Sequence, residues 1–165
     1  MWRGTLEANA LREFLADTEW GDLDGLVLDL PPGTDRLEPL HRLLPSLDGL
    51  VLVTLGSELS SFVVGKSVRR ARELGVPAIG YVENMTGYAC PHCGELGPLF
   101  GDGEGFEGLV RLARVPFDPE LSRLADLGRP YVLERPDAPA ARAIFDAARA
   151  VRSFLTGRAG SGEAP

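Results

Sequence analysis

Three apolar runs of strand length divide the sequence, and segments with helical spacing separate them. The runs are "DGLVLDL" (24–30), "DGLVLVTL" (48–55) and "VPAIGYVE" (76–83), and a shorter one, "RVPF" (114–117), follows. Continuous apolar runs are typical of strands covered on both faces, as in parallel sheets. Helices are expected over residues 6–16, 36–44, 57–74, 104–113, 118–128 and 138–155. This alternation predicts an α/β fold with a doubly wound, mainly parallel sheet flanked by helices.

Composition narrows the range of functions. The net charge is −7, which argues against nucleic acid as a partner because phosphate binding needs a basic face. No apolar run reaches the roughly 20 residues of a membrane span, and the N-terminus lacks the pattern of a signal peptide. We therefore expect a cytoplasmic protein with one domain over residues 1–156, an insertion at 84–103 and a disordered polar tail at 157–165.

The helix expected at 57–74 has the clearest ends. Gly75 is suited to the residue after the helix, and Pro77 prevents continuation. The helical spacing predicts an inward face made of Leu59, Phe62, Val63, Val68, Ala71 and Leu74. The same reasoning for the last helix predicts a shared face of Ile144, Ala148, Val151 and Leu155.

Ligands of doubly wound sheets bind at the carboxyl ends of the strands, which directs attention to "DLPPGTD". Asp29 follows a predicted strand and has the chemistry to hold Mg²⁺, mostly through water. Gly33 permits close approach of a backbone N–H to a phosphate. The alternative is that Asp29 is a solvated strand end and the prolines only stiffen the loop.

Asn84 ends the third predicted strand, in "VENM". Its amide both donates and accepts hydrogen bonds, which suits the edge of a purine ring. The alternative is an ordinary turn residue, a common use of asparagine at the end of a strand.

Cys90 and Cys93 form a C-x-x-C pair and are the only cysteines of the chain. Thiolates bind zinc or iron–sulfur clusters, but both usually need about four protein ligands. Two copies related by a two-fold axis would supply four thiolates, which favours a [4Fe–4S] cluster bridging a homodimer. Zinc in the same dimeric site, a thiol–disulfide pair and two inert thiols are the alternatives.

The order of D-L-P-P-G-T, V-E-N-M and C-P-H-C-G, with "LFGDGEG" and "VPFDPELSRLADLGRPYV" behind them, resembles the Mrp/ApbC-type P-loop ATPases, iron–sulfur cluster carriers related to MinD. The resemblance covers most of residues 2–132. It implies that Asp29 and Gly33 belong to the Walker B and switch II segment and that Asn84 contacts adenine. It further implies that Pro116 and Asp118 line the adenine pocket.

The resemblance also implies a role for the cysteines. Cys90 and Cys93 match the pair that holds a cluster at a dimer interface. Proteins of this type bind ATP as dimers and pass a labile [4Fe–4S] cluster to apo iron–sulfur proteins.

The family's first strand and Walker A loop have no counterpart in this sequence. Without that loop the phosphates lose their backbone cradle and lysine, so we expect weak ATP affinity and no hydrolysis by this chain alone. The missing strand would lie centrally, and its absence is expected to expose a sheet edge and apolar surface. A split protein with a separate P-loop half, a degenerate homologue and a truncated gene product are all compatible with this pattern. The alternative function is a non-catalytic interaction module, half of a split ATPase, with zinc or no metal.

Overall fold

The computed structural model describes residues 2–31, 36–89, 92–93, 95–101 and 105–159. Its elements in order are α1 (Trp2–Asp17), α2 (Leu37–Leu43), β1 (Leu50–Leu55), α3 (Glu58–Glu73), β2 (Ala78–Ala89), β3 (Leu96–Gly97), β4 (Arg111–Phe117), α4 (Pro119–Asp126), α5 (Tyr131–Glu134) and α6 (Pro139–Ala159). None of the helices in these ranges has the length and apolar character required to cross a bilayer.

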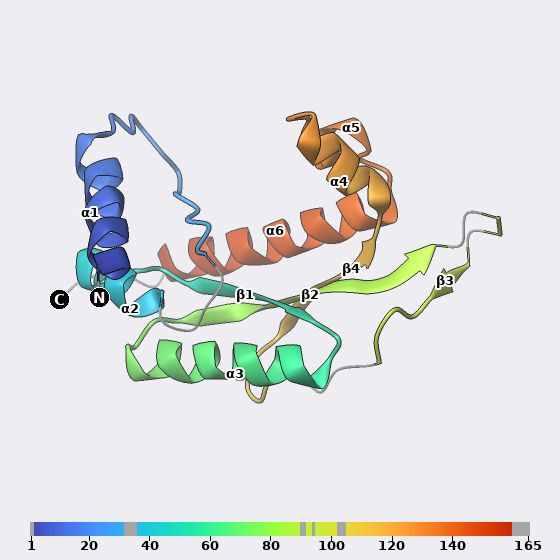
Figure 1. Ribbon diagram of the computed structural model, residues 1–165, viewed down its shortest axis with the longest axis horizontal. Helices are drawn as coiled ribbons and strands as arrows, with labels where there is room; N and C mark the ends of the chain where they lie inside the picture. The colour runs from blue at the N-terminus through green and yellow to red at the C-terminus, as the bar shows by residue number, and fades with distance from the viewer. Residues whose placement is uncertain (1, 32–35, 90–91, 94, 102–104, 160–165) are drawn as a thin grey trace.

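The sheet is built around β2. β1 and β4 pair with β2 in parallel, with Leu52 opposite Tyr81 and Asn84 opposite Val115. β3 pairs antiparallel with the far end of β2. Figure 1 shows α3 on one face of the sheet and α6 on the other. The predicted fold class, a mainly parallel α/β sheet with helices on both faces, is confirmed.

Local sequence explains the helix boundaries. Ser57 caps α3 by accepting a hydrogen bond from the backbone N–H of Ser60, and Asp118 caps α4 in the same way through Glu120. Gly75 has φ +70° and follows the end of α3, as its sequence context predicts.

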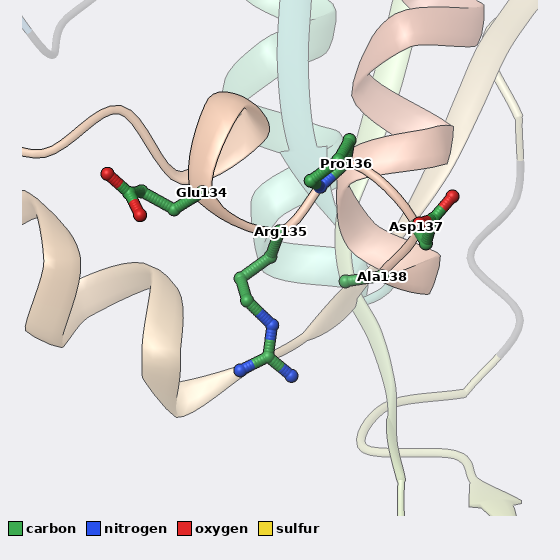
Figure 2. A pocket seen from close by; sticks show the side chains of 5 residues that line it. All are labelled: Glu134, Arg135, Pro136, Asp137 and Ala138. Atoms are coloured by element: carbon green, nitrogen blue, oxygen red, sulfur yellow. The ribbon is translucent and has the colours of Figure 1, made fainter.

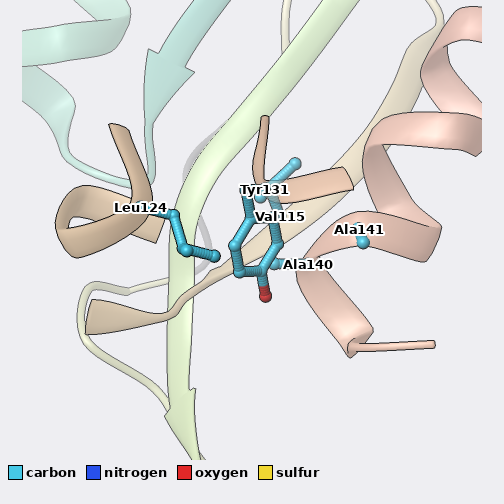
Figure 3. Close-up of a cluster of buried hydrophobic side chains, with 5 residues drawn as sticks. All are labelled: Val115, Leu124, Tyr131, Ala140 and Ala141. Atoms are coloured by element: carbon cyan, nitrogen blue, oxygen red, sulfur yellow. The ribbon is translucent and has the colours of Figure 1, made fainter. Parts of the chain in front are cut away.

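Apolar clusters fill both sides of the sheet. On one side, Val115 of β4 packs with Leu124, Tyr131, Ala140 and Ala141 from the C-terminal helices (Figure 3). On the other, Leu52, Val68 and Tyr81 join β1, α3 and β2. The two clusters fix β2 between two layers of helix.

The first predicted strand, residues 24–30, does not form. This segment is irregular, and the Val27 side chain is 94% exposed. A strand needs hydrogen bonds from a neighbouring strand, and the described part of the chain offers this segment none.

The helix predicted at 104–113 is also wrong. β4 already begins at Arg111, and residues 105–110 form an irregular connection. Phe106 and Leu109 of this connection pack against the cluster of Leu52, Val68 and Tyr81. The Phe106 ring meets the Tyr81 ring edge to face, with centroids 5.0 Å apart. Packing against the sheet therefore outweighs the helical spacing of the sequence.

The inward face predicted for α3 is only partly correct. Val68 and Ala71 are buried and Leu74 is half-buried, but Val63 is exposed and Leu59 and Phe62 are 75% and 64% exposed. In α6, Ala148 and Leu155 are exposed, and the buried positions are Ala140, Ala141 and Ala147 instead. α6 also extends to Ala159, so helix replaces the first three residues of the predicted disordered tail.

Candidate functional site

Cys93 lies on an arm, which we define by the described residues 85–89, 92–93 and 95–101. The arm consists of the end of β2 and the short β3, paired as Tyr88 with Gly97 and Ala89 with Leu96. Tyr88 also pairs with Phe117 of β4, and their rings lie 6.0 Å apart between centroids. Figure 1 shows this end of β2 and β3 projecting beyond the helical layers.

Cys93 is exposed on this arm and carries a free thiol. Cys90 lies outside the described residues. Within the part of the chain that the structure describes, no three His, Cys, Asp or Glu side chains are close enough together to hold a metal ion. The accessible Cys93 thiol can therefore meet ligands that approach from outside the monomer.

Asn84 lies within β2, opposite Leu55 at the end of β1 and Val115 of β4. Its Oδ1 accepts a hydrogen bond of 2.9 Å from the backbone N–H of Met85, and Met85 has φ +54°. Asn84 is thus within a strand that continues to Ala89, not at the end of the strand as the sequence predicted. The contact with Met85 engages the carbonyl side of the amide, and the Nδ2 group is the part suited to donate to a ligand.

Pro116 follows Val115, which is opposite Asn84, and Asp118 follows Phe117, which is opposite Tyr88 farther along β2. Asp118 Oδ1 accepts the backbone N–H of Glu120 at 2.9 Å, and Oδ2 accepts the Tyr131 hydroxyl at 2.5 Å. Burial, and then the hydrogen bond to Asp118, raise the pKa of Tyr131 well above its usual value. Both oxygens of Asp118 thus serve the fold.

Asp29 does not lie at the end of a strand, where the Walker B prediction placed it. Asp29 is exposed in the irregular segment that replaces the predicted strand, and Gly33 lies outside the described ranges. A carboxylate needs a strand end to fix its direction, and that strand is not formed here.

Glu83 is a functional candidate that sequence reasoning missed. Its side chain is 4% exposed and its Oε2 lies 3.0 Å from Arg111 and 3.5 Å from Arg114. A buried carboxylate is unfavourable unless cations and hydrogen bonds compensate it. The available signal was an acid inside an apolar strand, "GYVE", with two arginines in the neighbouring strand.

Two cavities lie by the C-terminal helices. One of about 320 Å³ is lined by Glu134, Arg135, Pro136, Asp137 and Ala138 (Figure 2). Figure 2 shows its charged side chains spreading apart, so they do not converge on a ligand. The other, about 410 Å³ and mostly apolar, lies beside Tyr131 and is lined by none of the predicted site residues.

Comparison with protein families shows to which family the chain belongs. The ParA family model, described as the NUBPL iron-transfer P-loop NTPase, matches residues 1–152. The chain belongs to this family. The resemblance to Mrp/ApbC-type carriers drawn from the sequence is thereby confirmed.

Curated relatives of this NUBPL-family chain are named iron-sulfur cluster carrier proteins. That of Saccharolobus solfataricus is 38% identical over 154 residues, which cover 90% of this chain and 52% of the relative. That of Methanocaldococcus jannaschii is 40% identical over 139 residues, with 81% and 48% covered. The chain therefore spans about half the length of the curated relatives it matches.

Solved structures show the same relationship. A nucleotide-binding protein from Archaeoglobus fulgidus in complex with ADP superposes with a TM-score of 0.68 at 36% identity, covering 81% of this chain and 56% of its own. The septum site-determining protein MinD from Pyrococcus horikoshii, at 20% identity and a TM-score of 0.63, shows the fold alone.

Proposed function

We propose that this NUBPL-family chain carries a [4Fe–4S] cluster as cargo, held between two copies by Cys90 and Cys93 of each, and delivers it to apo iron–sulfur proteins. The observation that carries the proposal is the family match over residues 1–152, which includes the only cysteine pair of the chain. Relatives with the name iron-sulfur cluster carrier protein support it.

The position of Cys93 suits the proposed sharing. Its thiol is exposed on the projecting arm, so a second copy can approach it without unfolding either monomer. One chain supplies two thiolates, and a cluster of this type usually takes four. A two-fold axis near the arm would complete the ligand set, because the same surface then meets itself. A cluster held at an exposed edge is also accessible to a recipient.

For nucleotides, we propose adenine contacts but only weak binding. Asn84 and Pro116 would contact an adenine edge, with Asp118 holding the start of α4 in place. The Asn84 Nδ2 group is the donor available for a ring nitrogen, since Oδ1 takes the Met85 N–H. When bound, Mg²⁺–ATP would supply charge at the carboxyl end of the sheet. The sequence has no Walker A loop to cradle its phosphates, so we propose weak binding and no hydrolysis by this chain alone.

Anaerobic reconstitution with iron and sulfide tests the cluster. We expect a brown protein with about two irons per chain, the share of one four-iron cluster between two chains. The Cys93→Ser variant should lose colour and iron, and His92→Ala, a matched change on the same arm, should keep both. Iron that persists after Cys90→Ser with Cys93→Ser contradicts the proposal. Zinc in the purified protein, bound by the same thiols, would favour the alternative metal.

A second candidate function is an interaction module that binds a P-loop-bearing polypeptide. The observation that favours it is exposed apolar surface: Val53 on β1 is 60% exposed, and Leu59 and Phe62 on α3 are exposed as well. Within the described part of the chain, β1 pairs only with β2, which leaves its other edge open. Co-purification with a polypeptide that contains a Walker A loop would support this candidate. A monodisperse chain that captures no such polypeptide would contradict it.

A further inference from the structure

We propose that Gly56 and Glu83 position the cysteine arm by holding its return leg against the body of the protein. We call the contact among Gly56, Glu83, Phe100 and Gly101 the arm-base contact. Its consequence for cluster binding rests on the proposed function, but its structural part does not.

We call residues 85–89 the outgoing leg of the arm and residues 95–101 its return leg. Different contacts hold the two legs. The outgoing leg is the continuation of β2, which β4 pairs as far as Tyr88. Among the described residues, the return leg has the two β3 pairs before it meets the body at Gly101. The arm-base contact is therefore what fixes the return leg.

Gly56 is buried at this contact, in the turn between β1 and α3. A Cβ at this position would lie 2.6 Å from the Gly101 carbonyl oxygen and 3.0 Å from Glu83 Oε1. Real Cβ atoms do not approach backbone atoms so closely, so any side chain would force the return leg or the turn to move. Glycine here permits a close backbone approach.

Hydrogen bonds make the turn around Gly56 resistant to movement. The Leu55 N–H donates to Ser60 Oγ at 3.0 Å, and the Thr54 and Ser60 hydroxyls bond at 3.0 Å. Thr54, which anchors this turn, is opposite Glu83 in the sheet. An added methyl group at Gly56 would therefore displace the arm sooner than the turn.

Glu83 is the second residue of the body of the protein in this contact. Its Oε2 forms ion pairs with Arg111 and Arg114, and its Oε1 faces Gly56. The arm begins two residues after Glu83. The carboxylate thus lies where both ends of the arm join the body of the protein. A small shift at this position would move Cys93, farther out on the arm, by a larger distance.

Amide hydrogen exchange of the full-length apo protein tests the structural part. We expect Gly56→Ala to accelerate exchange across residues 95–101 about tenfold, the response of a locally opened segment, with α4 and α6 unchanged. Gly65→Ala is the matched control, because a Cβ at Gly65 meets no atom of the described residues within 4 Å. Exchange that is equal in the two variants overturns the proposal.

Cluster retention tests the functional part. Gly56→Ala should release iron to a chelator about tenfold faster than Gly65→Ala, the lower range for losing a residue that orients metal ligands. Equal release rates with intact folding overturn this role. Should Gly56→Ala fail to fold, Glu83→Gln takes its place: faster exchange in the arm supports the contact and unchanged exchange overturns it. A wild-type protein that holds no cluster would contradict the proposed function, while the exchange comparison would still decide the arm-base contact.

Discussion

The Tyr131 hydroxyl donates a hydrogen bond to the Asp118 carboxylate, whose other oxygen caps α4. Tyr131 is itself part of the buried cluster between β4 and the C-terminal helices. One carboxylate thus connects the end of β4, the start of α4 and the start of α5. Asp118, which the family resemblance links to an adenine pocket, is thus held by contacts within the fold.

Tyr131→Phe removes this hydrogen bond and keeps the ring. We expect a loss of about 1–2 kcal/mol in the free energy of unfolding, because Asp118 Oδ2 is left without its donor. Chemical denaturation at neutral pH measures the change. A variant as stable as the wild type would show that water replaces the hydroxyl without penalty.

The raised pKa of Tyr131 predicts a pH dependence. The unfolded phenol loses its proton near pH 10, below the pKa of the folded state, so deprotonation favours unfolding as the pH rises. The contribution should be complete below about pH 10 and decline above it. Unfolding curves from pH 8 to 11 should therefore converge for wild type and Tyr131→Phe at the alkaline end. A difference that grows with pH would refute this assignment.

Glu83 depends on its two arginines. Replacing both Arg111 and Arg114 by alanine should lower stability by about 1–3 kcal/mol, since a buried carboxylate is left without a cation. The control is Arg123→Ala, which removes an exposed ion pair with Glu120 and should leave stability nearly unchanged. Equal effects of the two changes would mean that the Glu83 carboxylate is not held by these cations.

Replacing glycine by alanine should have opposite effects on stability at Gly75 and at Gly65. Gly75 has φ +70°, so Gly75→Ala should destabilise the protein by about 1 kcal/mol. Gly65 lies inside α3 with open space around it, so Gly65→Ala should stabilise by about 0.5–1 kcal/mol. Melting temperatures that move in the same direction for both variants would contradict the backbone assignment.

The exposed face of α3 should matter for association but not for stability. Phe62→Ser removes an exposed ring that Lys66 covers at 4.6 Å, and stability should stay within about 0.5 kcal/mol. Binding to a P-loop-bearing polypeptide, or self-association in its absence, should weaken in sedimentation experiments. Association that is unchanged would remove this face from the proposed interface.

The sequence predicted the parallel sheet and the end of α3 correctly because these depend on local residues: the apolar runs and Gly75. It failed at 24–30 and 104–113, where long-range pairing decides the outcome. An apolar run without a neighbouring strand stays irregular, and Phe106 reaches Tyr81 only because its segment is not a helix.

The candidate site also combines features that the sequence suggests with contacts that only the fold creates. Asn84 and the cysteine pair stay predictions from residue patterns, and the sheet places Asn84 opposite Val115, the neighbour of Pro116. The arm-base contact was not visible, because Gly56 and Gly101 are far apart in sequence and meet only through the path of the arm.

The most direct test of the shared cluster is the native mass of the anaerobically reconstituted protein. The account predicts two chains plus one four-iron, four-sulfide cluster, converting to apo monomers when the cysteines are replaced. A monomer that carries a complete cluster, or a dimer of the same mass with and without both cysteines, would contradict it.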